Sequence, residues 1–396
     1  MSTLLSVPAA LAAVLARAEP LPSEDVPLEA AAGRILAAPV ASLVDLPPFP
    51  SSSMDGYAVR AGDLPAMLPV VDRSAAGRPA SRRLEPGEAI EISTGAVVPE
   101  GADTVVPVER VEVDADEISI SESVVQGDNV RRRAGDVGAG DRILAAGVVL
   151  TPARIGAAAA CGLETVGVHR LPRVTILVTG TELRRPGALL EPGQIYESNG
   201  IMLEAVLRES GAVVERLAAA EDTEEALEQA LERALTADVV VTSGGVSVGP
   251  HDLVRRVEAR LGVEEVFWGV AMRPGKPLAF GVRGQTLVFG LPGNPVSSLV
   301  GSLLFVRPAL LALQGHPDPA PPFRPGTLMH ELRPRPERDD FVRARIAWSE
   351  AGPVLDPILG QESHMIVHTT AADALVHVPR GTDPLAAGAR VEYLLL

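Results

Sequence analysis

Cysteine and aromatic side chains are the scarcest features of this sequence. Cys161 is the only cysteine among 396 residues, which excludes an intrachain disulfide and a cysteine-rich zinc site and favours a reducing cytoplasm. Aromatic residues make up 3% of the chain, so the core must rest on Ala, Val, Leu and Ile. The sequence shows no Ser–His–Asp spacing, no metal-ligand histidine pair and no cysteine nucleophile, which leaves other chemistry to be found.

Positive charge is also in short supply. Lys and Arg total 35 against 51 Asp and Glu, for a net charge of −16. With no basic run to offset this charge, nucleic acid is not expected as a partner. A small anion can bind only in a locally basic pocket. The chain has no charge-free apolar stretch of about 18 residues, so no membrane span is expected.

The apolar run near the amino terminus is interpreted as a helix. No Lys or Arg precedes the run, which disfavours a secretory signal. Ser6 and Pro8 instead match a helix N-cap followed by proline in the first turn.

The pattern of residue types changes four times along the chain, which predicts several domains. Short helices around a proline-broken linker, including one near 28–38, suggest a discontinuous N-terminal domain over 1–45 and 131–172. Short Val/Ile/Glu runs broken by Gly and Pro predict a β insertion over 46–130. Alternating strands and helices over 173–316 predict an α/β domain with a parallel sheet covered on both faces. Residues 323–396 predict a small β-barrel or sandwich.

In an α/β domain of this kind, ligands bind beyond the carboxyl ends of the strands. The segment "TSGGVSVGPHD" follows one predicted strand. Its Gly244, Gly245 and Ser247 could bring backbone N–H groups to a phosphate, although a structural turn is the alternative. Asp252 opens the next helix, where it either complements the helix dipole or holds Mg²⁺ against a phosphate. Glu197, before another helix, is either a capping residue or a ligand.

Two further segments add positive charge and a tight turn. In "MRPGKP", Arg273 and Lys276 flank Pro-Gly and form a candidate anion site, with a solvated loop as the alternative. In "LPGNPVS", Pro292 and Pro295 shape a turn into a helix. Asp55, in "PPFPSSSMDGYAVR", either accepts turn hydrogen bonds or meets a ligand.

Together these motifs resemble a known family. "PPFPSSSMDGYAVR", "STGAVVPEGADTVVPVER", "RRRAGDVGAGD", "GQIYESNGIMLEAVL", "TSGGVSVGPHD", "MRPGKPLAFG", "GLPGNPVSSLV" and "GQESHMI" are similar, in content and order, to the MoeA-type molybdopterin molybdenumtransferases, which include the gephyrin E domain. The resemblance implies four domains and a homodimer whose active site lies between subunits, with Asp55 acting on the partner's site. It also implies a cytoplasmic, Mg²⁺-dependent reaction in which molybdate is inserted into adenylylated molybdopterin and AMP is released.

The resemblance also implies roles for particular residues. Asp55, Glu197, Asp252 and Lys276 are carried over as catalytic, with Asp252 and Glu197 as candidate Mg²⁺ ligands. Arg273, Lys276 and Ser297 are expected to bind molybdate, with Arg343 and Ser363 near it. The other residues carried over as substrate-binding are Thr94, Asp136, Asp238, Gly244, Gly245, Ser247, Pro292 and Pro295.

Several positions depart from the family pattern, and two other functions remain open. Ser51 stands where the family usually has Asn, and Thr181 stands where it usually has Asp. Gly135 stands where the family usually has an acidic residue beside the first position of "AGD", and Val367 and His368 stand where it often has serines. One alternative is a molybdopterin adenylyltransferase, although such proteins lack the flanking β domains. The other is a scaffold of the gephyrin type. A separate adenylyltransferase is also a candidate docking partner.

Overall fold

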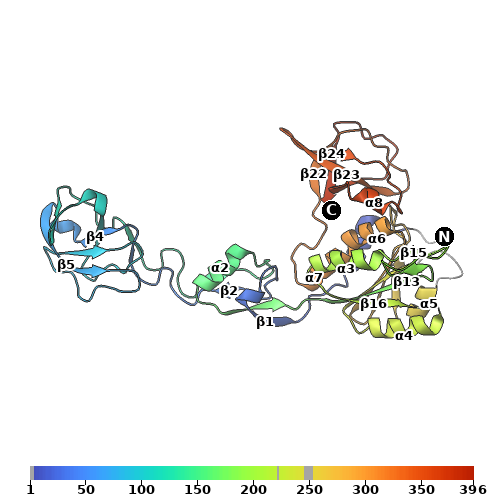
Figure 1. Ribbon diagram of the computed structural model, residues 1–396, viewed down its shortest axis with the longest axis horizontal. Coiled ribbons are helices and arrows are strands. Elements are labelled where there is room, and N and C mark those ends of the chain that lie inside the picture. Colours follow the sequence, from blue (N-terminus) through green and yellow to red (C-terminus); the bar gives the residue numbers. More distant parts are fainter. Residues whose placement is uncertain (1–3, 221–222, 245–252) are drawn as a thin grey trace. The chain divides into compact units, whose positions relative to one another are not determined.

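The computed structural model describes residues 4–220, 223–244 and 253–396. The chain forms two compact units (Figure 1). Unit 1 comprises Met1–Glu24, Gly33–Ala37 and Val168–Leu396, and unit 2 comprises Asp25–Ala32 and Ala38–Gly167. The boundary falls within β1 (Ser23–Pro27) and β12 (Thr165–His169). The four domain ranges expected from the sequence stay a prediction.

A six-stranded sheet is the centre of unit 1. Its order is β16-β13-β17-β21-β20-β18. The first four strands are parallel to one another. At one edge, β20 runs antiparallel to both of its neighbours, β21 and β18. The strands are β13 (Arg173–Thr179), β16 (Val213–Ala220), β17 (Val239–Ser243), β18 (Glu264–Trp268), β20 (Ala279–Arg283) and β21 (Thr286–Leu291).

The parallel strands are as expected from the sequence, and the antiparallel edge is an addition that the sequence pattern did not predict. Strands β20 and β21 pair from Ala279–Gly290 to Arg283–Thr286. Only Gly284 and Gln285 lie between them. Such a short connection makes a hairpin, because a parallel pair needs a crossover of a dozen or more residues.

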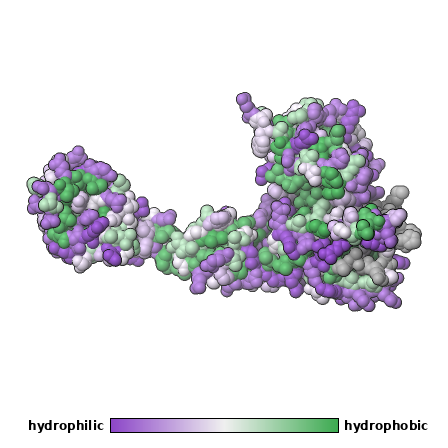
Figure 2. Space-filling model, in the orientation of Figure 1, coloured by the Kyte–Doolittle hydropathy of each residue, from purple (hydrophilic) through white to green (hydrophobic). Residues whose placement is uncertain are grey.

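Helices cover both faces of this sheet, as expected. On one face α1 (Val7–Leu15), α3 (Asn199–Glu209) and the helix formed by α6 (Pro295–Gly301), η4 (Ser302–Val306) and α7 (Arg307–Leu313) enclose the main core. On the other face lie α4 (Glu224–Ala234) and α5 (Leu253–Arg260) (Figure 1). Hydrophilic residues dominate the surface around α4 (Figure 2). Among the described residues, Pro295–Leu313 is the one helix long and apolar enough to cross a membrane, and 83% of that window is buried inside the protein.

Side-chain N-caps begin α1 and α4, and the N-cap expected at Ser6 is confirmed. Ser6 accepts a hydrogen bond from the Ala9 N–H, and Thr223 accepts one from the Ala226 N–H. These bonds satisfy N–H groups that have no partner inside the helix. Pro152 lies in the first turn of α2 (Pro152–Ala160).

The helix expected near 28–38 is wrong. The structure has only a short 3-10 turn, η1 (Leu28–Ala30), and Gly33 adopts a φ of +75°. The consecutive residues Ile35 and Leu36 are both buried. Tertiary burial on both sides of the backbone therefore overrides the helical propensity of this Ala-rich stretch.

The carboxyl-terminal part of unit 1 is a closed barrel, as expected. The strands β23, β24, β22, β26 and β25 pair in that order, and β25 pairs back to β23. Their bounds are β22 (Arg324–Leu328), β23 (Asp339–Ser349), β24 (Gly352–Pro357), β25 (Ala374–Val378) and β26 (Arg390–Leu395). The short strand β19 (Met272–Arg273) pairs with β23, and α8 (Ile366–Thr369) lies between β24 and β25 in the chain. Closure leaves these strands with few free edges.

Unit 2 contains the expected β insertion. A six-stranded sheet has the order β7-β4-β6-β5-β9-β8, and its apolar side chains form two clusters. Its strands are β4 (Gly56–Val59), β5 (Ala66–Ser74), β6 (Ala89–Ile92), β7 (Thr104–Pro107), β8 (Glu112–Asp114) and β9 (Glu117–Ile120). The remaining elements are the ribbon β3 (Ser51–Ser52) with β10 (Val130–Arg131), the ribbon β2 (Val40–Ala41) with β11 (Arg142–Leu144), η2 (Ala61–Asp63) and η3 (Val108–Arg110). The multidomain α/β fold class predicted from the sequence is thus confirmed.

Candidate functional site

The order of strands in unit 1 indicates where a ligand can bind. From β13 the chain moves through α3 to β16 on one side, and β17 lies on the other side of β13. Ligands of open α/β sheets bind beyond the carboxyl ends of the strands at such a point. A cavity of about 760 Å³ opens there. We call it the strand-end cavity; its polar lining includes Thr179, Glu182, Glu197, Ser198, Ser243 and Gly244.

The ends of β13, β17 and β21 are held close together at this cavity. Gly244 has a φ of +95°, and a Cβ there would lie 2.7 Å from the Thr179 carbonyl oxygen. Only glycine permits that approach. The buried Asn199 donates hydrogen bonds to Ser243 Oγ at 2.9 Å and to the Gly293 carbonyl at 2.7 Å. Asn199 belongs to the motif "GQIYESNGIMLEAVL", but the sequence assigned it no role, and the structure makes it a structural residue of the site.

Glu197 both caps a helix and faces the strand-end cavity. Its Oε1 accepts a hydrogen bond of 2.6 Å from the Gly200 N–H, and its Oε2 lies 3.8 Å from Arg216 Nη1. Ser198, the N-cap residue of α3, makes no capping bond with its side chain. Glu182 is a second carboxylate on the cavity wall, whereas Thr181, the departure from the family pattern, does not line it.

A second cavity, of about 450 Å³, gathers positive charge. Its lining contains Arg273 and Lys276, as expected, and also Arg335 and Arg338 from the barrel. We call it the cation-lined cavity. Arg335 lies between two prolines in "RPRPER". Prolines also stiffen the "RPGKP" segment, so the sequence carried a comparable motif that could have pointed to Arg335 as a further candidate cation. The predicted hydroxyl residues Ser297 and Ser363 also line this cavity.

The loop between the two predicted cations has a tight geometry. Gly275 adopts a φ of +104°, and a Cβ there would lie 2.5 Å from Met272 Cε. Lys276 is exposed, and it is the only lysine in a chain with 34 arginines. An ammonium is a compact, rotatable point charge, whereas a guanidinium is a planar fork. Arg273 and Lys276 therefore offer an anion two different kinds of donor.

A buried carboxylate lies next to these cations. Asp340 pairs with Arg335 at 3.4 Å, and its strand position is directly opposite Arg273 in the β19–β23 pair. Its Oδ1 is buried and has no hydrogen-bond partner among the residues that the structure describes. Burial raises the pKa of Asp340, against the opposing effect of Arg335, Arg273 and Arg338.

The two cavities adjoin. Both are lined by Pro277, Pro292, Asn294 and His364. The side chain of Asn294 does not cap α6; its Nδ2 donates to Ser363 Oγ at 2.9 Å. An anion among the cations and a ligand at the strand ends would therefore lie next to each other.

Arg343 does not line either cavity. It is 1% exposed, and its guanidinium donates to the carbonyls of Gly360, Glu362 and Met365 and to Thr369 Oγ1, at 2.6–3.2 Å. Burial lowers the pKa of this guanidinium. The geometry makes Arg343 the anchor of the loop that carries Ser363, and direct binding of substrate by Arg343 stays a prediction.

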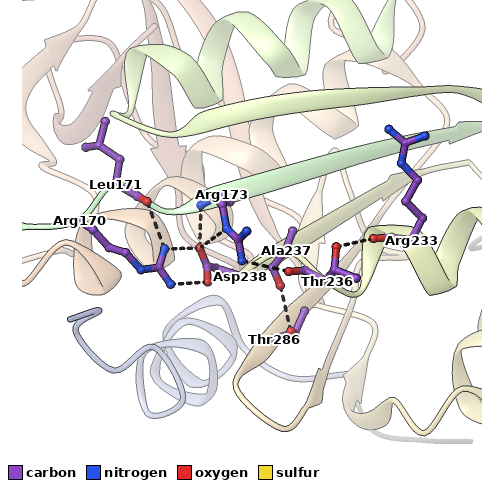
Figure 3. A network of polar contacts seen from close by, with 8 residues as sticks. All are labelled: Arg170, Leu171, Arg173, Arg233, Thr236, Ala237, Asp238 and Thr286. Atoms are coloured by element: carbon purple, nitrogen blue, oxygen red, sulfur yellow. Dashed lines mark hydrogen bonds and ion pairs between the residues drawn. The ribbon is translucent and has the colours of Figure 1, made fainter.

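Asp238 lies at the start of β17, at the opposite end of the strand from the strand-end cavity. Its carboxylate accepts two hydrogen bonds of 2.7 Å from Arg170 and one of 2.8 Å from the Arg173 N–H (Figure 3). Burial by itself raises the pKa of Asp238, but the bonds from Arg170 and Arg173 outweigh it, so that the pKa is lowered. The structure thus gives Asp238 a role in joining β13 to β17 and does not bring it to the cavity.

Three predicted residues belong to unit 2. Asp55 and Thr94 lie together, since Asp55 Oδ1 accepts a hydrogen bond of 2.9 Å from the Thr94 N–H. Asp136 follows a turn closed by the Gly135 N–H and the Arg132 carbonyl. All three side chains are exposed, and their action on a partner subunit stays a prediction.

Gly245, Ser247 and Asp252 lie outside the described residues. Within the described ranges, no group of three or more His, Cys, Asp or Glu side chains is arranged to hold a metal ion. That does not conflict with Mg²⁺, which is usually held by one or two carboxylates together with water and substrate phosphates.

Three family models match the chain in order. Residues 5–162 match the MoeA N-terminal region (domain I and II), 175–312 a probable molybdopterin binding domain, and 325–396 the MoeA C-terminal region (domain IV). The chain belongs to the MoeA family.

Relatives and solved structures agree with membership of the MoeA family. A molybdopterin molybdenumtransferase 2 of Mycobacterium tuberculosis is 40% identical over 93% of both chains, and a molybdopterin molybdenumtransferase of Haemophilus influenzae is 36% identical over 94% of this chain and 93% of its own. The crystal structure of a molybdopterin biosynthesis MoeA protein from Pyrococcus horikoshii matches 99% of both chains, with a TM-score of 0.85 and 34% identity.

Proposed function

We propose that the chain inserts molybdate into adenylylated molybdopterin and releases AMP in a Mg²⁺-dependent reaction. Membership of the MoeA family makes it a transferase of molybdenum cofactor biosynthesis. The observation that carries the detailed proposal is the contact between the cation-lined cavity and the strand-end cavity, which share four lining residues. A reaction between an oxyanion and a large nucleotide-bearing ligand needs two such sites side by side.

The cation-lined cavity suits a tetrahedral metal oxyanion. Arg273 offers a planar pair of donors and Lys276 a compact charge, and the hydroxyls of Ser297 and Ser363 can donate to further oxygens. In a chain with a net charge of −16, this local excess of cations is what permits a dianion to bind. The serines missing at Val367 and His368 are not needed for this set, because neither position lines the cavity.

The strand-end cavity suits the adenylylated pterin. The N-terminus of α3 lies at this cavity, and the backbone N–H groups of a helix N-terminus favour phosphate. Glu197 could hold Mg²⁺, because its carboxylate faces the cavity and keeps free lone pairs beside its bond to Gly200. Asp252 is the second candidate from the sequence. When bound, Mg²⁺ would offset the charge repulsion between phosphate oxygens and stabilise the leaving phosphate.

We further propose that the protein acts in the cytoplasm as a homodimer, with Asp55 of one subunit completing the site of the other. Unit 2 exposes apolar side chains that a partner subunit could cover, including Leu43 and Val44 at 65% and 39% exposure and, in the segment before Asp55, Phe49 and Met54. Apolar surface is visible around α2 in Figure 2. Sedimentation of the wild-type protein as a monomer at micromolar concentration would contradict this part of the proposal.

The test supplies adenylylated molybdopterin, molybdate and Mg²⁺ and follows AMP release. Release should require molybdate, and Asp252→Ala should abolish it without disrupting the dimer. Glu197→Gln keeps an oxygen to accept the Gly200 bond but removes the charge, so it should slow release by at least about tenfold if Glu197 holds Mg²⁺.

Glu204→Gln is the matched control for Glu197. Glu204 pairs with the same arginine, Arg216, at 2.5 Å, but does not line the strand-end cavity. Equal AMP release with and without molybdate would contradict coupled insertion. Consumption of ATP with free molybdopterin would favour an adenylyltransferase, and dimerisation without any turnover would favour a scaffold.

A further inference from the structure

His364 lies where the two cavities meet. It lines both of them, together with Pro277, Pro292 and Asn294. Prolines and an amide do not exchange protons at neutral pH, whereas an imidazole does. His364 is therefore the one side chain shared by the described walls of both cavities that can accept and release a proton.

The backbone around His364 is anchored from two directions. From the barrel, the buried Arg343 donates to the carbonyls of Glu362 at 3.2 Å and Met365 at 2.8 Å. From the α/β domain, Asn294 donates to Ser363 Oγ at 2.9 Å, and the Val296 N–H donates to the Ser363 carbonyl at 3.1 Å. The position of His364 is thus set by the cavity walls themselves.

The ring of His364, in contrast, makes no hydrogen bond or ion pair with any residue that the structure describes. Other histidines differ from it. His169 Nδ1 lies 2.6 Å from the Leu21 carbonyl oxygen, and the ring of His377 stacks on Phe341 with 5.2 Å between centroids. A fixed backbone with an unpartnered ring leaves both ring nitrogens available to a ligand.

The reaction proposed above needs protons moved at this junction. When two dithiol sulfurs bind molybdenum, two Mo–S bonds form, one Mo–O bond breaks, and two S–H protons must leave. The departing oxo group takes up both protons and leaves as water, while molybdenum stays hexavalent and no electron is transferred. The sulfurs belong to the pterin ligand and the oxo group to the oxyanion, so the protons must cross from one cavity to the other.

We propose that the His364 imidazole carries these protons, one at a time, from the dithiol sulfurs to the departing oxo group of molybdate. The inference rests on the proposed function and assigns a further catalytic residue to it. One ring nitrogen accepts the proton as each sulfur approaches molybdenum, and the imidazolium then donates to the oxo group, which is general base followed by general acid catalysis.

The variant that tests this is His364→Gln, with His368→Gln as the matched control. His368 lies four residues further on in α8, is exposed and lines neither cavity. Molybdenum transfer by His364→Gln should fall about 100-fold at saturating substrates, with the KM for molybdate changed less than about threefold. Its pH–rate profile should lose a limb that the wild-type profile shows. Imidazole in solution should restore part of the rate of His364→Ala.

A second measurement does not depend on turnover. In NMR spectra of the wild-type protein, the ring signal of His364 can be identified by its loss in His364→Gln. This signal should shift when molybdate alone is added, whereas the ring signal of His368 should not shift. Molybdate binding that leaves the His364 signal unchanged overturns the inference. So does a His364→Gln protein with the wild-type rate and pH profile. A wild-type protein that transfers no molybdenum overturns the proposed function itself, which is a distinguishable result.

Discussion

The role of Asp238 can be decided by one substitution, Asp238→Asn. In the wild type, the carboxylate receives two bonds from Arg170 and one from the Arg173 N–H. Hydrogen bonds to charged groups contribute about 1.5–3 kcal/mol each. Asparagine keeps one acceptor oxygen but turns an NH₂ group towards the guanidinium donors. Since Arg170 is 31% exposed, water offsets part of the loss, and we expect the substitution to cost about 3 kcal/mol.

The pH dependence of this loss has a definite sign. The pKa of Asp238 is lowered below its ordinary value of 3.8. A carboxyl group with a lowered pKa stabilises the folded state at pH values above its unfolded pKa, and that stabilisation is lost as the pH falls through the folded pKa. The difference in stability between wild type and Asp238→Asn should therefore be constant near pH 7 and shrink only below about pH 4.

The assay is urea unfolding followed by the fluorescence of Trp268, which lies on β18 of the same sheet. The chain has two tryptophans, so all variants carry Trp348→Phe to isolate this signal. Asp383→Asn, an exposed control in the barrel, should change stability by less than about 0.5 kcal/mol. Unchanged stability of Asp238→Asn, combined with weaker pterin binding, would refute the structural role and support the substrate-binding role implied by the resemblance.

Two other substitutions test the cation-lined cavity and its support. Lys276→Arg keeps the charge but replaces the compact ammonium with a planar guanidinium, so molybdate affinity measured by calorimetry should fall about tenfold. Because Lys276 is the only lysine, an amine-selective reagent should label only this residue and the amino terminus, and bound molybdate should protect Lys276. Labelling of Lys276 that molybdate does not reduce would contradict the assignment. Arg343→Met removes the anchor of the loop around Ser363. Backbone hydrogen exchange over 360–369 should therefore speed up, and the barrel should lose about 3–5 kcal/mol of stability. Unchanged exchange would show that other contacts hold the loop.

Local sequence signals predicted where helices begin. Ser6 and Thr223 cap their helices because a side-chain oxygen beside a free N–H acts within a single turn. The same locality explains the failure near 28–38, where Ile35 and Leu36 are buried by residues distant in sequence. A pattern of apolar residues does not reveal which distant partners will bury it.

The candidate site shows the same division. Arg273, Lys276, Ser297 and Ser363 were predicted from motifs and line one cavity. Arg335 was missed, because its approach to Arg273 depends on the pairing of β19 with β23.

By itself, the sequence determined the class of the fold, the family and several of the groups that line the two cavities, among them Arg273, Lys276 and Glu197, because short motifs encode turns, caps and charge. Only the tertiary structure decided that Asp238 joins strands away from the cavity, that Arg343 supports a loop, and that His364 lies between two sites. Those roles depend on which segments meet in space, and the contacts that bring them together join residues far apart in the chain.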